Sequence, residues 1–142
     1  MSEHIHGKNF DEVVTVIVRN DGRYDRGAYE FVREALDHTL AEIVKKQPGR
    51  AGQHVSGREL LDGIRDYAIR QYGPMAMTLF KQWGISRGRD FGEIVFNLIE
   101  YGMFGKTERD SIDDFDGCYD FDETFVKPFL PPSRRNGKST RQ

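Results

Sequence analysis

The sequence is poor in cysteine, in long apolar runs and in charge of one sign. Cys118 is the single cysteine of the 142 residues, which excludes an intramolecular disulfide and favours a reducing compartment. No stretch approaches the ~18 consecutive apolar residues that span a bilayer, and the first ten residues lack the apolar run of a secretory signal. A net charge of −2 creates no global attraction to nucleic acid or acidic membranes. We therefore expect a cytoplasmic protein without a membrane partner.

The signatures of common catalytic sites are also missing. Gly73, Gly84 and Gly102 are placed to end helices, and they do not form a glycine-rich phosphate loop. Cys118 lies among aspartates, which disfavours a thiolate nucleophile. His38 falls off the apolar stripe of its predicted helix, so we expect it on the surface, and the sequence offers it no obvious acid or base partner. We predict no enzymatic activity and no cofactor.

The length suits a single domain with its own core. We expect a disordered N-terminus over residues 1–9 and one globular domain over 10–126. Residues 103–126 carry 2 Lys/Arg and 8 Asp/Glu, whereas residues 127–142 carry 5 and none. We predict that 127–142 is an extended, proline-containing segment followed by a basic disordered tail.

Two helices are predicted at the N-terminal end of the domain. Apolar residues from Phe10 to Val18 recur at helical spacing, although the β-branched run over 13–18 also suits a strand. Asn9 as a cap and Asn20-Asp21-Gly22 as a stop decide for a helix. Asp25 caps the second helix, which has one continuous apolar face. That face consists of Ala28, Phe31, Val32, Ala35, Leu36, Thr39, Leu40, Ile43 and Val44.

Three shorter helices are predicted between Ser56 and Tyr101. Ser56 and Glu59 form a capping box, and the helix that they start ends at Gly73, where Pro74 begins the next. Asp90 and Glu93 predict a second capping box before a helix over 91–101. Short strands are expected over 103–107 and 119–121, with Phe115, Tyr119 and Phe121 as aromatic anchors.

Several motifs in this region resemble bacterial winged helix-turn-helix domains. Trp83-Gly84-Ile85-Ser86 is similar to the turn between their second and third helices, and Leu98-Ile99-Glu100-Tyr101-Gly102-Met103-Phe104 is similar to the exit into their wing. The resemblance implies a mainly α fold. Two N-terminal helices would pack on a winged-helix-like three-helix core, over residues 54–122, with a small β wing.

A longer set of segments resembles a bacterial family of uncharacterised proteins restricted to planctomycetes and verrucomicrobia. The resemblance spans residues 10–122 and implies the domain limits, but it brings no known activity. The segments are Tyr24-Asp25, the helix Ala28–Leu40, His54-Val55-Ser56-Gly57-x-Glu59-Leu60-Leu61, Asp90-Phe91-Gly92-Glu93-Ile94-Val95-Phe96-Asn97-Leu98 and Tyr119-Asp120-Phe121.

The polar stripe of the helix over 91–101 carries the wrong charge for a DNA recognition helix, which needs donors toward phosphates and base edges. We therefore expect a non-enzymatic intracellular protein-interaction module or regulator, with another protein as its partner. The candidate surface combines this stripe with the acidic segment that follows it. Its residues are Glu93, Asn97, Glu100, Asp110, Asp113 and Asp114.

The alternative is a nucleic-acid-binding transcriptional regulator. In that interpretation arginines at the start of the helix and basic residues near the wing and in the tail contact phosphates. These residues are Arg87, Arg89, Lys106, Arg134, Arg135, Lys138 and Arg141. A calcium loop over 112–123 is disfavoured, because Ile112 stands where the first carboxylate ligand is needed. No metal ligands are predicted.

Overall fold

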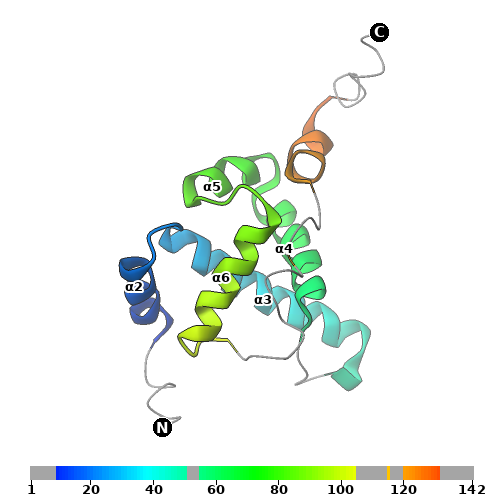
Figure 1. The fold of residues 1–142 in the computed structure, drawn as a ribbon. Coiled ribbons are helices and arrows are strands. Elements are labelled where there is room, and N and C mark those ends of the chain that lie inside the picture. Colours follow the sequence, from blue (N-terminus) through cyan, green and yellow to red (C-terminus); the bar gives the residue numbers. More distant parts are fainter. Residues whose placement is uncertain (1–8, 51–54, 105–114, 116–119, 132–142) are drawn as a thin grey trace.

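The structure is a computed structural model that describes residues 9–50, 55–104, 115 and 120–131. Over these ranges it is mainly helical and contains no β-strand. The longer helices are α2 (Phe10–Asn20), α3 (Arg26–Lys46), α4 (Gly57–Tyr72), α5 (Ala76–Trp83) and α6 (Gly88–Glu100) (Figure 1). The short helical turns are η1 (Pro48–Arg50), η2 (Gly73–Met75), η4 (Asp122–Val126) and η5 (Lys127–Phe129). The prediction of a mainly α fold is confirmed.

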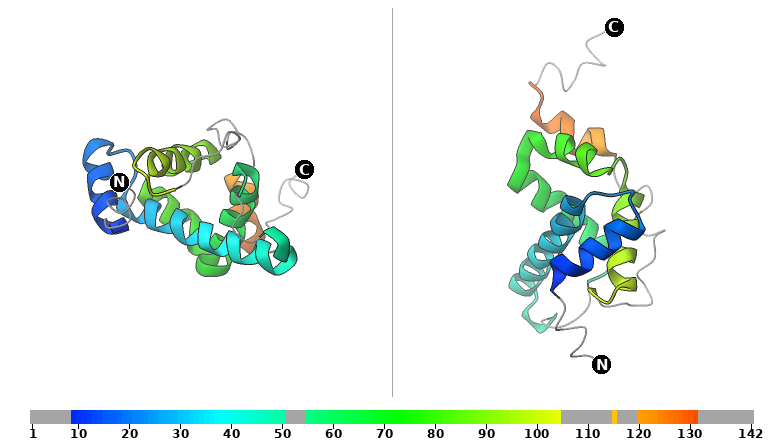
Figure 2. Two further views of the ribbon diagram at one scale, coloured as in Figure 1. Left: turned by 90° about the horizontal axis from the view of Figure 1, so that it is seen from below. Right: turned by 90° about the vertical axis from the view of Figure 1, so that its left-hand side faces the viewer.

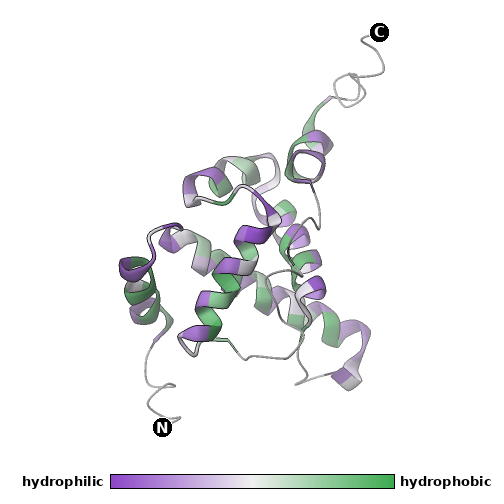
Figure 3. Cartoon of the chain, viewed as in Figure 1, coloured by the Kyte–Doolittle hydropathy of each residue, from purple (hydrophilic) through white to green (hydrophobic). Residues whose placement is uncertain are grey.

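The first element is a helix, as its caps predict. The Asn9 side chain accepts a hydrogen bond of 2.8 Å from the backbone N–H of Glu12, which satisfies one of the unpaired donors at the start of α2. Val13, Val14 and Ile17 turn inward and are buried. Figure 3 shows hydrophobic and hydrophilic residues interspersed along the helices, as expected for helices with one buried face.

Helix α3 is the central element, because it contacts α2, α4, α5 and α6. Asp25 caps it by accepting from Gly27 N at 2.8 Å. The N-terminal half of α3 is enclosed by the other helices, and its C-terminal half extends beside α4 (Figures 1 and 2). The two long helices therefore form a platform along which the later elements pack.

Phe80 of α5 lies at the centre of an aromatic core. Its ring centroid is 5.5 Å from those of Phe31 and Phe91, and 5.1 and 5.7 Å from those of Phe125 and Phe121. Edge-to-face and tilted pairs at such separations are favourable beyond simple area burial. Helices α3, α5, α6 and the turn η4 are thus joined through one cluster of rings.

The predicted strand at Phe121 is wrong in this structure, and the segment predicted to be extended from residue 127 starts with a short helical turn. Phe121 leads into the π-helical turn η4, and Lys127–Phe129 forms a 3₁₀ turn with Pro128 in its first positions. Asp120 explains the turn, since its side chain accepts from the N–H groups of Asp122 at 2.8 Å and of Glu123 at 3.1 Å. Proline suits the start of the next turn, because its missing N–H has no partner to lose there.

The start of α6 also differs from the prediction. The helix begins at Gly88, and Asp90 is its third residue rather than its cap. Asp90 accepts from the N–H groups of Ser86 at 2.8 Å and Arg87 at 3.2 Å, and from the Tyr24 hydroxyl at 2.6 Å. The same carboxylate therefore closes the first turn of α6 and connects it to the start of α3.

Helix α6 ends at Glu100, and Gly102 in the turn that follows has a φ of +78°. Met103 and Phe104 belong to the terminating turn, since their N–H groups donate to the Leu98 carbonyl at 2.8 and 3.2 Å. The rest of the predicted wing, including Tyr119, lies outside the described residues. Phe115 is a buried anchor, as predicted, at 2 % exposure. A Cβ added at Gly92 would lie 3.0 Å from its ring.

Two turns that are distant in sequence rest against each other. The Asp25 N–H donates to the Trp83 carbonyl at 3.1 Å. Gly84 has a φ of +90°, and a Cβ there would overlap the Arg23 carbonyl oxygen. Only glycine accepts both this conformation and this close approach without strain. The turn between α2 and α3 is thus fixed against the turn between α5 and α6.

Candidate functional site

The predicted surface on α6 is largely engaged within the chain. Glu93 faces Arg23, with a separation of 3.4 Å, and Arg89, at 3.7 Å. Arg23 also forms a 2.8 Å ion pair with Asp21. Only 20 % of the Glu93 side chain is exposed, so this carboxylate serves the packing of α6 against the α2–α3 turn.

Asn97 extends the same network into the interior. Its amide donates to Asp21 Oδ2 and to the Tyr29 hydroxyl, both at 3.0 Å. Hydrogen bonds from Arg23, and a further one from Asn97, hold the pKa of the Asp21 carboxyl well below its usual range. Burial raises the pKa of Tyr29. The stripe that the sequence suggested as a docking face is thus in large part a seam between α6, α3 and the α2–α3 turn.

Other residues of that prediction remain on the outside or cannot be placed. Glu100 is exposed, as is Phe96 one turn earlier, with 43 % of its area accessible. Residues at this spacing are neighbours on one side of a helix. Asp110, Asp113 and Asp114 lie outside the described residues.

A groove lies where α2 meets the end of α6. It has a volume of about 290 Å³ and is lined by Glu12, Val13, Val16 and Tyr101. Val16 and Tyr101 are 38 % and 37 % exposed. The Asn20 amide donates to the Tyr101 hydroxyl at 2.9 Å, which holds the tyrosine beside α2. The groove therefore presents apolar walls next to one carboxylate.

The basic residues of the alternative interpretation are only partly placed. Arg87 is exposed at the start of α6, while Arg89 lies next to Glu93. Lys106, Arg134, Arg135, Lys138 and Arg141 are not among the described residues. The structure therefore brings no set of these basic side chains together in the part of the chain that it describes.

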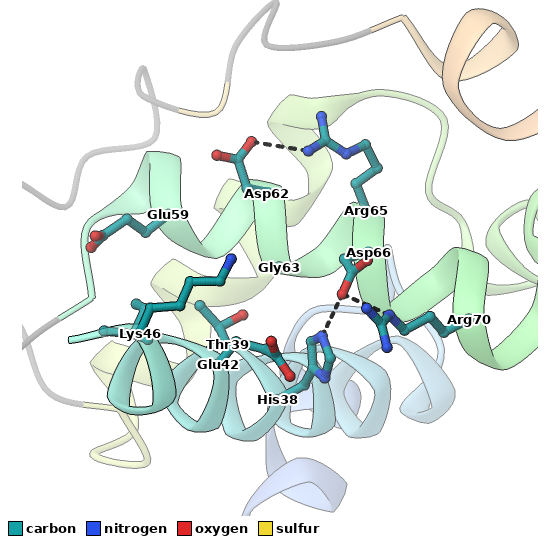
Figure 4. Close-up of a pocket in the computed structure, with 11 residues that line it drawn as sticks. His38, Thr39, Glu42, Lys46, Glu59, Asp62, Gly63, Arg65, Asp66 and Arg70 are labelled. Atoms are coloured by element: carbon teal, nitrogen blue, oxygen red, sulfur yellow. Dashed lines mark hydrogen bonds and ion pairs between the residues drawn. The ribbon is translucent and has the colours of Figure 1, made fainter. Parts of the chain in front are cut away.

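A second hollow lies between α3 and α4 and was not anticipated. It has a volume of about 410 Å³ and is lined chiefly by charged side chains from the two helices. His38, Asp66 and Arg70 point toward one another at one end (Figure 4). His38 Nε2 is 2.7 Å from Asp66 Oδ2, and Arg70 Nε is 3.0 Å from the same oxygen.

The expectation that His38 is a partnerless surface residue is wrong. Its side chain is only 16 % exposed, and its ring lies 5.4 Å from that of Tyr67. Partial burial alone would raise the pKa of Asp66, but the hydrogen bonds from His38 and Arg70 outweigh it and lower that pKa. The carboxylate thus holds the histidine and the arginine in place across the two helices.

The floor of this cleft is a very close helix contact. A Cβ at Gly63 would overlap Thr39 Oγ1, and the Thr39 hydroxyl donates to the Ala35 carbonyl at 2.7 Å. That hydroxyl is buried and already committed, so it lacks the adjacent base that activates a nucleophile. At the other end Arg50 and Glu59 form a two-pronged ion pair at 2.5 and 3.1 Å. The His38–Asp66 pair joins α3 to α4, and the Arg50–Glu59 pair joins η1 to α4.

Among the residues that the structure describes, no three His, Cys, Asp or Glu side chains are grouped to hold a metal ion. Two carboxylates of the segment considered as a calcium loop are described: Asp120 caps η4, and Glu123 forms an ion pair with Lys127 at 2.8 Å. These carboxylates already have structural partners.

The sequence could not reveal the cleft, because its pairs connect positions far apart in the chain. His38 and Asp66 are separated by 28 residues. The available signal was weak: Asp66 and Arg70 are at i, i+4, as are Asp62 and Asp66, on a side of α4 that also contains Gly63. A small residue within a charged helical face is compatible with a close crossing but does not specify the partner helix.

Compared with known proteins, the chain matches no family model, no curated protein and no solved structure.

None of the described helices has both the length and the apolar character needed to cross a bilayer.

Proposed function

We propose that the chain is a non-enzymatic protein-interaction module that binds its partner on the outer face of α2 and the end of α6. The observation that supports this most directly is the exposure of Val16 and Tyr101 along one groove. Phe96 of α6 is a further large apolar side chain that is exposed, at 43 %. Exposed apolar groups that gather on one face are typical of binding surfaces.

The charges around this face suggest the character of the partner. Glu12 lines the groove and the exposed Glu100 lies one turn from Phe96, so α2 and α6 each contribute a carboxylate. A partner segment with apolar anchors bordered by Lys or Arg would complement it. In this proposal Asp110, Asp113 and Asp114 extend the acidic flank.

The proposal retains the winged-helix-like order of α4, α5 and α6 as a scaffold, with the wing formed by residues beyond Phe104. It also places the protein in the cytoplasm, on the grounds of its single cysteine. Neither point is needed for the binding face to act. That face depends on α2 and α6 alone.

Affinity capture with paired variants tests the proposal. Val16→Asp puts a charge in the groove, whereas Val44→Asp puts the same charge at an equally exposed valine of α3, 36 % accessible against 38 %. We expect Val16→Asp to lose the captured protein and Val44→Asp to retain it. Equal capture by the two variants, with both folded by circular dichroism, would contradict the proposed face.

Nucleic acid is tested in parallel. Anisotropy of labelled duplex and single strands at roughly 50 and 200 mM salt separates phosphate-driven binding from the rest, because such binding falls steeply with salt. We expect no binding at the lower salt. Tight, salt-sensitive binding that is lost on Arg87→Glu would instead favour the regulator that contacts nucleic acid.

A further inference from the structure

Two charges on the outer side of α2 have no partner among the described residues. Glu12 and Arg19 are both exposed and make no ion pair within the described ranges. The neighbouring acid, Asp11, differs, because it pairs with Arg26 at 2.5 Å. One carboxylate and one guanidinium thus face outward on the same helix.

These two residues form a single stripe with Val16. Positions 12, 16 and 19 follow the i, i+4, i+7 spacing, which places them on one side of a helix. Glu12 and Arg19 are separated by about 10 Å along the axis at 1.5 Å per residue, so they are too far apart to pair within the helix. The order along the stripe is negative, apolar, positive.

Such a stripe is complementary to itself in an antiparallel arrangement. If two copies of α2 cross at Val16, Glu12 of each copy faces Arg19 of the other, and the two valines meet between them. Two identical ion pairs then form about a twofold axis, which is the usual symmetry of a dimer of identical chains. We infer that the partner of this face is a second copy of the chain. This inference rests on the proposed function, whose binding face it shares.

The surroundings of the stripe allow this contact. Helix α2 lies at an edge of the molecule, with its outer side away from the other described helices (Figures 1 and 2). The groove lined by Val13, Val16 and Tyr101 runs beside the stripe and gives apolar side chains of the second copy a place to insert. A single helix pair with its flank should bury less than the ~1,200 Å² at the lower limit of stable interfaces, so we expect a weak dimer in exchange with monomer.

Charge reversal provides the test. Sedimentation velocity of the full chain, from about 10 µM to 1 mM, is expected to show a mass that rises with concentration toward that of a dimer. Glu12→Arg or Arg19→Glu alone replaces both ion pairs by like charges and should weaken association about tenfold or more. The double variant E12R/R19E, and an equimolar mixture of the two single variants, again place opposite charges at both contacts and should restore it.

A matched control separates this geometry from net charge. Asp122→Arg makes the same reversal at an exposed position of η4, far from α2 (Figure 1), and should leave association unchanged. A monomer mass at every concentration, or a double variant as weak as the single ones, would overturn self-association. If the mass stays monomeric while Val16→Asp still abolishes capture of a different protein, the proposed function stands and only the identity of the partner is wrong.

Discussion

The two halves of α3 are held in place by different forces. Its N-terminal half contributes Phe31 to the rings around Phe80, and every apolar residue that it turns inward over 28–35 is buried. Its C-terminal half meets α4 through one close contact, Thr39 on Gly63, and through pairs such as His38 with Asp66. The first half is stabilised mainly by apolar burial, which does not depend on the ionisation of side chains. The second half depends on ion pairs and on the lack of a side chain at Gly63, which lets the two helices approach closely.

The largest expected effect is at the centre of the aromatic core. Phe80→Ala removes a fully buried ring that lies next to five others, and should lower the free energy of unfolding by about 3–5 kcal/mol. Urea denaturation followed by circular dichroism measures the change. Phe129→Ala, at a ring that is 37 % exposed, is the control and should cost much less. A loss below about 1 kcal/mol for Phe80→Ala would contradict the central position of this ring.

A smaller effect is expected at the crossing of α3 and α4. Gly63→Ala gains helix propensity of roughly 1 kcal/mol, but the new methyl group overlaps Thr39 Oγ1, and such overpacking costs typically 1–3 kcal/mol. We therefore expect a net loss of stability in denaturant melts. Gly22→Ala has no atom within 4 Å of the added carbon and should be close to neutral.

A double-mutant cycle makes this second test specific. Thr39→Ala removes the hydroxyl that the new methyl group would meet, so G63A should be less damaging in the T39A background than in the natural one. Equal effects of G63A in both backgrounds would mean that the two helices are farther apart than the structure shows.

The smallest effect is the pH dependence of the cleft. Asp66 has a lowered pKa in the folded chain, so its ionised form contributes stability above the unfolded pKa of about 3.9. This contribution disappears as the pH falls through the folded pKa. Asp66→Asn should cost about 1 kcal/mol or less at pH 7, because the carboxylate is 42 % exposed. The difference from the natural chain should shrink as the pH falls below about 3.9, and a difference that stays constant across this fall would contradict this origin.

Local signals in the sequence predicted most of the helix boundaries. Asn9, Asp25 and the Ser56–Glu59 box all cap helices in the structure, because a cap depends on residues three or fewer positions apart. The capping box predicted for Asp90 and Glu93 is three residues too late, because Arg87 is the cap and Asp90 is the third residue of α6. The Tyr24 hydroxyl donates to Asp90 across 66 residues of sequence, and this contact favours Asp90 as the third residue of the helix.

The candidate surfaces were harder to predict for the same reason. Glu93 and Asn97 have the spacing of an exposed stripe, and only the fold shows that Arg23 and Tyr29 face them from an earlier part of the chain. Val16 lies within the apolar run of α2, and the helical period turns it outward, where it is 38 % exposed. Periodicity predicts which residues share a face, but it does not show which neighbours cover that face.

The contact between the two turns has a consequence for how the molecule opens. The Asp25 N–H bonded to Trp83, and the fit of Gly84 against Arg23, connect segments about 60 residues apart. Neither turn is complete without the other, so the terminal helix α2 should not fray separately from α5 and α6. In native-state hydrogen exchange the Asp25 amide should therefore exchange at the rate of the α5 amides, as one cooperative unit.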